Sequence, residues 1–140
     1  MNADEGAVTH GHELTNGSYR VSIADDGMGS SYFGDLAITR RVPDLTRETD
    51  SFALYIRDLE SGEYWSAGAE PVRIAGDAYE ATATDSAITL VREHGGIRTT
   101  LEVSLVAGAM AEERRLWIEN VSGRARRLDV TTYAELVLNT

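Results

Sequence analysis

The sequence has no cysteine, no lysine and only two prolines. Without cysteine there are no disulfides, no thiolate metal ligands and no cysteine nucleophile; this suits a reducing compartment, so we expect a cytoplasmic protein. No apolar run approaches the roughly 18 residues of a membrane-spanning helix, so we expect no membrane partner. The 13 basic residues, all Arg, are scattered in a chain of formal charge −10, which argues against a nucleic-acid partner.

What is present is the composition of one globular domain: 140 residues with 42% hydrophobic and 26% charged side chains. A domain of this length buries roughly 68% of the surface of its unfolded chain, so we expect a hydrophobic core. The chain starts with a polar, acidic stretch. We therefore expect residues 1–12 to be a flexible N-terminal segment and residues 13–140 to be the folded domain.

Hydrophobic and polar residues alternate with a period of two, which is typical of strands with one buried face. The clearest runs are residues 97–106 and 128–138, and weaker runs cover residues 19–24, 32–40, 51–59, 78–84, 87–92 and 113–120. Turn-forming pairs such as Asn16-Gly17 and Gly95-Gly96 separate them, and the one long connection, residues 42–50, is interpreted as a solvated crossover. The sequence predicts an all-β, antiparallel β-sandwich.

The histidines give little support for chemistry. His10 and His12 offer two imidazoles near one another, but a metal site needs further ligands, so no metal is expected. His94 precedes Gly95-Gly96 at a predicted hairpin tip, where we expect it to be solvated and without a catalytic partner. The sequence therefore predicts no metal site and no histidine-based catalysis.

Carboxylate pairs give no better support for catalysis. Asp25-Asp26 and Glu112-Glu113 are adjacent in the sequence, and neighbours along a strand point to opposite faces. Two carboxylates that act on one glycosidic bond must instead flank it from separate elements. We expect no catalytic residue and no cofactor.

The aromatic residues leave two interpretations open. Tyr64-Trp65 follows a turn, Trp117 lies on the polar side of its strand, and Tyr32-Phe33 opens another strand. Such rings stack on sugars in some proteins, and in small sandwiches they also complete the core or shield a sheet edge. The sequence alone does not choose between these uses.

Several motifs together resemble the N-terminal β-sandwich of the glycoside hydrolase family 94 phosphorylases, especially the version in cyclic β-1,2-glucan synthases. The resemblance spans roughly residues 13–138. It is carried by LTNGSY (14–19), GMGSSYFGDLAITR (27–40), YIRDL (55–59), SGEYWS (61–66) and RLDVTTYAE (127–135). Met28 replaces the middle glycine of the family's usual hairpin, and Ser30-Ser31 replaces its Tyr-Ser.

The resemblance implies a galactose mutarotase-like supersandwich, of which this chain is about half. In that family an (α/α)6 barrel carrying the catalytic acid follows the sandwich, and this sequence contains no such barrel. The implied function is that of a non-catalytic, carbohydrate-associated module of a β-glucan-processing protein. Its sugar-binding candidates are Tyr32, Asp35, Arg40 and Trp65.

Two other functions compete with this one. The chain is alternatively a purely structural domain that forms a homodimer or pairs with a missing second half and barrel, because residues 128–138 form a long strand with an apolar face that nothing later in the sequence covers. A small mutarotase-type enzyme is disfavoured because the sequence suggests no His with a carboxylate partner on neighbouring strands. Weak binding of a β-glucan or oligosaccharide distinguishes the carbohydrate module from the purely structural domain, and a sugar-epimerisation assay tests the mutarotase hypothesis.

Overall fold

The computed structural model describes residues 10–40 and 52–139, in which every regular element is a β-strand. A five-stranded sheet contains β1 (Gly11–Asn16), β2 (Tyr19–Ala24), β3 (Gly29–Phe33), β4 (Leu36–Thr39) and β12 (Leu136–Asn139). A four-stranded sheet contains β10 (Glu112–Asn120), β9 (Ile97–Leu105), β8 (Ala87–His94) and β7 (Ala78–Ala83). A three-stranded sheet contains β11 (Leu128–Ala134), β5 (Phe52–Asp58) and β6 (Tyr64–Ser66). The prediction of an all-β fold is confirmed.

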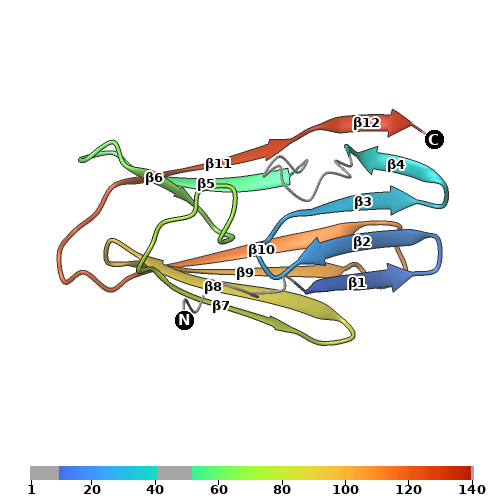
Figure 1. The fold of residues 1–140 in the computed structure, drawn as a ribbon, viewed down its shortest axis with the longest axis horizontal. Coiled ribbons are helices and arrows are strands. Elements are labelled where there is room, and N and C mark those ends of the chain that lie inside the picture. The colour runs from blue at the N-terminus through green and yellow to red at the C-terminus, as the bar shows by residue number, and fades with distance from the viewer. Residues whose placement is uncertain (1–9, 41–51, 140) are drawn as a thin grey trace, which may run out of the picture.

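All the strand pairs are antiparallel, and most join strands that are consecutive in the chain. The exceptions are the pairs of β11 with β5 and of β12 with β4, which bring the end of the chain back to its first half. Since β11 runs into β12 across Glu135, these two strands link the three-stranded and five-stranded sheets (Figure 1). The end of the chain thereby connects two of the three sheets that surround the core.

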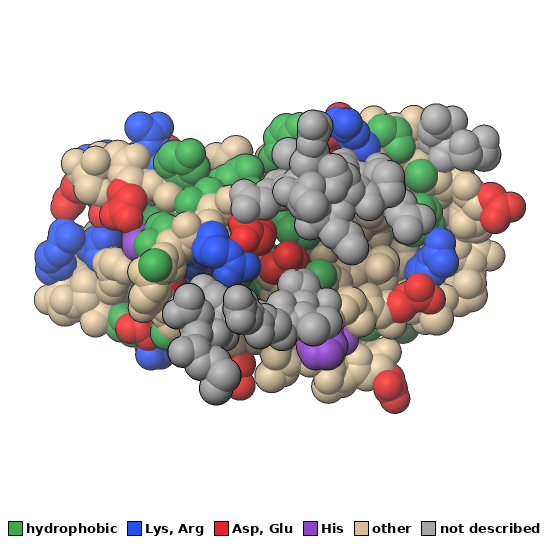
Figure 2. Space-filling view, viewed as in Figure 1, with side chains coloured by type: hydrophobic (Ala, Val, Ile, Leu, Met, Phe, Trp, Pro, Cys, Tyr) green, Lys and Arg blue, Asp and Glu red, His purple; other side chains and the backbone are tan. Residues whose placement is uncertain are grey.

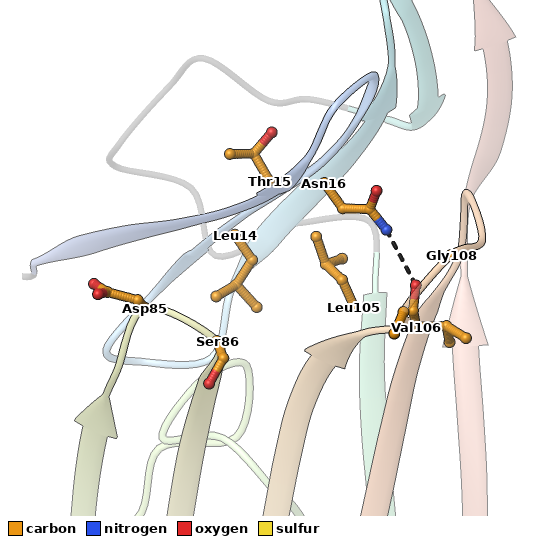
Figure 3. Close-up of a pocket in the computed structure, with 9 residues that line it drawn as sticks. Leu14, Thr15, Asn16, Asp85, Ser86, Leu105, Val106 and Gly108 are labelled. Carbon is orange, nitrogen blue, oxygen red and sulfur yellow. Dashed lines mark hydrogen bonds between the residues drawn. The ribbon is translucent and has the colours of Figure 1, made fainter.

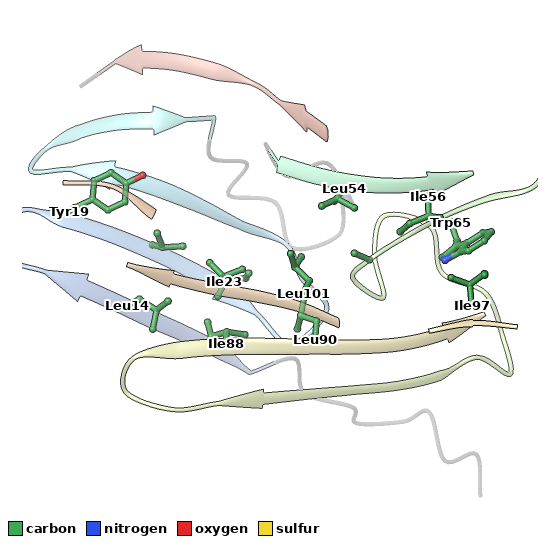
Figure 4. Close-up of a cluster of buried hydrophobic side chains, with 13 residues drawn as sticks. Leu14, Tyr19, Ile23, Leu54, Ile56, Trp65, Ile88, Leu90, Ile97 and Leu101 are labelled. Carbon is green, nitrogen blue, oxygen red and sulfur yellow. The ribbon is translucent and has the colours of Figure 1, made fainter. Parts of the chain in front are cut away.

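The core is built from the alternation that the sequence shows. On β9, Ile97, Thr99, Leu101 and Val103 are at most 4% exposed, and their intervening neighbours are only partly buried. Ile97, Leu101 and Val103 pack with inward side chains from the other two sheets, including Ile23 of β2 and Ile56 of β5 (Figure 4). Burying a side chain of this size stabilises the fold by about 1.5–3 kcal/mol, so this single cluster holds the three sheets together.

The structure divides two of the predicted runs. Residues 32–40 form a hairpin that turns at Gly34, and residues 128–138 break at Glu135 into two strands that belong to different sheets. The short strand β6 was not predicted, and β1 begins two residues before the expected start of the domain at residue 13. The predicted crossover, residues 42–50, lies outside the described residues.

The GMG segment forms a tight reversal between β2 and β3, as its glycines suggest. Gly27 has φ +94°, which side chains disfavour, and an added Cβ on Gly29 would lie 2.1 Å from the carbonyl oxygen of Ser22. The segment therefore serves strand reversal and close packing. In the described part of the chain, no helix has the length and apolarity needed to span a membrane.

Candidate functional site

A row of tyrosines crosses the outward face of the three-stranded sheet. Ile56 of β5 is fully buried, so its neighbours Tyr55 and Arg57 point to the other face. The register places Thr131 of β11 opposite Tyr55, and Tyr64 of β6 opposite Arg57. Two neighbouring strands thus add an aromatic ring and a hydroxyl to the face that Tyr55 and Arg57 occupy.

These side chains line a shallow groove of about 710 Å³, which we call the tyrosine groove. Its walls are Tyr55, Arg57, Gly62, Tyr64, Pro71, Val72 and Thr131. In Figure 2 hydrophobic side chains, among which tyrosine is counted, gather over the part of the molecule where Figure 1 shows β5, β6 and β11. The groove combines apolar ring surface with a guanidinium and a hydroxyl.

The rings of Tyr55 and Tyr64 are arranged edge to face, with centroids 6.3 Å apart and planes at 66°. Tyr64 is 57% exposed, whereas Tyr55 is partly buried. Burial raises the pKa of Tyr55, and the nearby phenols of Tyr64 and Tyr133 raise it further. The edge of one tyrosine ring thus packs against the face of the other, and the Tyr64 ring stays largely exposed to solvent.

Trp65 requires a correction, because the sequence suggested that it lines a sugar surface. Its side chain is 1% exposed and belongs to the hydrophobic core. Trp65 pairs with the buried Ile56 and points inward, whereas Tyr64 before it points outward. The aromatic ring that the motif presents to solvent is therefore that of Tyr64.

The other three predicted sugar-binding residues lie on the β3–β4 hairpin, and they do not form one surface. Arg20 lies over the Tyr32 ring, with its guanidinium carbon 4.6 Å from the ring centroid, and covers one face of it. Asp35 is in the turn, and Arg40 follows the opposite end of β4. Arg40 donates a hydrogen bond to Glu135 at 3.1 Å. The structure thus separates Asp35 from Arg40 by the length of β4.

His94 also requires a correction, because it is neither solvated nor without carboxylate partners. Its side chain is 10% exposed. Nδ1 lies 2.7 Å from Asp77 and Nε2 lies 2.6 Å from Glu63. Because the two carboxylates contact opposite sides of one imidazole, they do not converge on a common point; among the described residues, no three such groups are arranged to hold a metal ion.

The buried Arg92 explains why His94 is covered. Arg92 is 2% exposed and donates hydrogen bonds to the carbonyl oxygens of Ser66, Gly68 and Val72, at 2.7–2.8 Å. It also pairs with Asp77 at 2.9 Å. Arg92 thereby folds the connection between β6 and β7 over the end of β8, where His94 lies. This long-range arrangement has no signal in the local sequence.

A third polar cluster lies inside the sandwich around Glu112. Its carboxylate accepts hydrogen bonds from Tyr19 at 2.9 Å, from Ser31, and from Arg114 at 2.9 Å. Burial opposes ionisation of Glu112, but Arg114 and these hydrogen bonds outweigh burial and lower its pKa. Glu113 instead pairs with Arg115, so the expectation that Glu112 and Glu113 point apart is confirmed.

A second hollow, of about 250 Å³, lies between the hairpin turns at one end of the sandwich (Figure 3). Asn16 closes it by donating hydrogen bonds to the carbonyl oxygens of Val106 and Ala109, at 3.1 and 2.8 Å. Asp85 is its one titratable side chain. It offers no acid–base pair, and the tyrosine groove remains the best candidate for a ligand site.

Comparison with known proteins finds similarity to a glucan synthase and to two phosphorylases. The chain is 31% identical over 125 residues to the cyclic beta-(1,2)-glucan synthase NdvB of Rhizobium meliloti. This match covers 89% of this chain and 4% of that protein. It is 36% identical over 80 residues to cellobionic acid phosphorylase of Neurospora crassa, covering 57% of this chain and 10% of the relative. It is 33% identical over 84 residues to solabiose phosphorylase of Paenibacillus borealis. This match covers 60% of this chain and 11% of the relative.

The chain thus spans 4% to 11% of the length of these relatives. A family profile described as the glycosyl hydrolase 94 supersandwich domain matches residues 4–140. The family resemblance inferred from the motifs is confirmed, and so is the fold that it implies. By its sequence and its sheets, this chain belongs to the glycosyl hydrolase 94 supersandwich family.

Proposed function

We propose that this domain is a non-catalytic, carbohydrate-associated module of a β-glucan-processing protein, and that it holds a glucan in the tyrosine groove. The observation that carries the proposal is the exposed ring of Tyr64 beside Arg57 and Thr131 in that groove. The names of the relatives, a glucan synthase and two phosphorylases, support a carbohydrate as the ligand.

The groove has the two kinds of surface that a sugar needs. The C–H face of a pyranose ring is apolar and packs against the Tyr64 ring, while its hydroxyls exchange hydrogen bonds with Arg57 and Thr131. Because the groove is shallow and open, we expect a dissociation constant of about 1 mM, equivalent to about −4 kcal/mol. Such an affinity suits a module that holds part of a polymer rather than one that encloses a small substrate.

The His94 cluster supports a structural role and not a catalytic one. Both ring nitrogens contact carboxylates, so the imidazole has no nitrogen left for a substrate proton. Its 10% exposure leaves little surface for a sugar. We therefore assign no residue of this domain to catalysis.

Calorimetric titration with β-1,2-glucan oligosaccharides tests the proposal. Tyr64→Ala should weaken binding about tenfold, or about 1.4 kcal/mol, because it removes the exposed ring. Tyr32→Ala is the matched control, since Tyr32 lies on the β3–β4 hairpin that the sequence favoured, and it should bind as the unmodified protein does. If only Tyr32→Ala weakens binding, the site lies on the hairpin. Absence of saturable binding would exclude the sugar-binding function.

A second function, that of a structural or dimerisation domain, is favoured by apolar side chains exposed along two sheet edges. Ile118 of β10 is 42% exposed and Val130 of β11 is 46% exposed, although both share the inward face with fully buried partners, Thr99 and Ile56. This function is compatible with a sugar in the tyrosine groove, because the groove lies on the outward face of its sheet.

A further inference from the structure

Trp117 of β10 is the second of the two tryptophans in the chain, and the core does not use it. Its side chain is 50% exposed, whereas that of Trp65 is 1% exposed. Its neighbour Leu116 pairs with the buried Leu101 of β9 and packs against the core. Because successive side chains of a strand point to opposite sides, Trp117 lies on the outward face of the four-stranded sheet.

The arginines beside Trp117 leave its ring uncovered. Arg115, two residues earlier on the same face, donates a hydrogen bond to Glu113. Arg98 of β9 lies opposite Glu119 and donates a hydrogen bond to it at 3.1 Å. In the described part of the chain, no aromatic ring or guanidinium stacks on the indole. The ring is therefore available to a ligand.

The surroundings of the ring are polar and held in place. Thr100 of β9 lies directly opposite Trp117, and Glu102, two residues further along β9, points to the same face. Arg98, two residues in the other direction, also donates a hydrogen bond to Glu93 of β8 at 2.9 Å. A hydroxyl, carboxylates and a guanidinium thus surround the ring, and the ion pairs restrict the movement of the charged side chains.

We propose that Trp117 and the polar groups around it form a second saccharide-binding face, on which a segment of a neutral glucan lies across the four-stranded sheet. The apolar C–H face of a pyranose ring stacks on the indole, and its hydroxyls exchange hydrogen bonds with Thr100 and Glu102. Arg98 and Arg115 already have carboxylate partners, so the face favours a neutral ligand over an anionic one. The site shares the ligand class of the proposed function but no residue of the tyrosine groove.

A protein partner fits this face less well than a saccharide. The tryptophans that dominate protein interfaces lie in patches whose core is depleted of charge and whose surrounding contacts exclude water. Along β10, however, the ring lies between Arg115 and Glu119, which are 58% and 64% exposed. The exposed apolar side chain next to it, that of Ile118, belongs to the other face of the strand. An isolated ring among polar groups suits a sugar ring.

The two saccharide sites lie on opposite sides of the core. Ile56 of β5 and Leu101 of β9 belong to the same buried cluster, so the outward faces of their sheets point away from each other (Figure 1). One domain can therefore hold two glucan segments at once, one on each side. Because a sheet face encloses less of a ligand than a groove does, we expect Trp117 to bind a saccharide more weakly than the tyrosine groove.

Tryptophan fluorescence tests the second site, because Trp65 is buried and Trp117 is the tryptophan that a ligand reaches. Oligosaccharides of β-1,2-glucan should shift the emission to shorter wavelength and protect it from acrylamide quenching. Trp117→Ala should abolish this response. Tyr64→Ala should retain it, since Tyr64 belongs to the other site. Thr82→Ala, at the far edge of the same sheet face, is the matched control and should also retain it.

Electrophoresis through a gel that contains soluble β-1,2-glucan separates the two sites. Trp117→Ala and Tyr64→Ala should each reduce the retardation of the protein in part, and the double variant should lose it. Trp117→Thr should behave as Trp117→Ala does while keeping a residue that strands favour. Circular dichroism of each variant shows whether the β fold is retained.

The outcomes distinguish this proposal from the tyrosine groove. If Trp117→Ala and Trp117→Thr are retarded as strongly as the unmodified protein, the second site is refuted and the groove stands. If they lose all retardation while Tyr64→Ala is unchanged, the second site stands and the groove is refuted. If the unmodified protein is neither retarded nor altered in its fluorescence, both sites are refuted.

Discussion

The indole of Trp65 packs against the imidazole of His94, with ring centroids 4.7 Å apart and ring planes at 51°. This contact joins β6 of the three-stranded sheet to β8 of the four-stranded sheet. The carboxylates of Asp77 and Glu63 hold the imidazole on its two sides. Trp65, which the sequence suggested as a sugar-binding residue, and His94, which the sequence suggested to be solvated, thus join two sheets of the sandwich.

Removing the Trp65 ring should strongly destabilise the fold. Trp65→Ala should lower the free energy of unfolding by about 3–5 kcal/mol, because it leaves a large cavity between sheets. Trp65→Phe should cost less, since the indole N–H is buried without a hydrogen-bond acceptor among the described residues and its loss removes an unfavourable group. Urea denaturation measures both effects. Tyr64→Ala on the same strand is the control; a loss as large as that of Trp65→Ala would contradict the assignment of Trp65 as the core residue.

The buried ion pair between Arg92 and Asp77 should contribute more to the stability of the fold than the exposed contact between His94 and Glu63. Asp77→Asn removes the charge that balances the buried Arg92, so we expect a loss of about 3–5 kcal/mol in the free energy of unfolding. Glu63→Gln changes a carboxylate that is 53% exposed and should cost less than about 1 kcal/mol. Guanidinium denaturation of both variants makes the comparison, and equal losses would show that Arg92 does not depend on Asp77.

Stability should fall at high pH because of two tyrosines. Burial raises the pKa of Tyr19 and that of Tyr79 to about 12, from an ordinary value of 10.0. Between these values the unfolded chain releases protons that the folded chain retains, so stability is unaffected below pH 10.0 and falls progressively toward pH 12. Tyr79→Phe should reduce this pH dependence. Denaturation curves across that range measure it, and a flat profile would mean that neither hydroxyl is shielded from water.

Gly29 should not tolerate a side chain. Gly29→Ala places a methyl group against the backbone of Ser22 and Ile23, so we expect a loss of about 1–3 kcal/mol in the free energy of unfolding. Gly11→Ala is the matched control, because nothing lies within 4 Å of an added Cβ there and its φ is not positive. Thermal denaturation compares the two. A neutral Gly29→Ala would mean that β2 and β3 approach less closely than the structure shows.

Local patterns determined the strands and most of the turns. Alternation in residues 97–106 predicted β9 and its buried face, because a strand directs successive side chains to opposite sides. The same rule predicted that the side chains of Glu112 and Glu113 point to opposite faces of their strand. The motifs were sufficient to indicate the family. Alternation also continues across Glu135, however, and it did not reveal that β11 and β12 join different sheets, since that break depends on which strands lie alongside.

The tertiary structure alone decided which polar and aromatic residues face water. Tyr64 and Trp65 are adjacent in sequence, and only the pairing of β6 with β5 directs one to the tyrosine groove and the other to the core. His94 precedes two glycines, which predicts an exposed tip, but Arg92 binds a connection from elsewhere in the chain and folds it over the imidazole. Sequence patterns report the preferences of neighbouring residues, whereas burial and charge pairing depend on contacts between residues far apart in the chain.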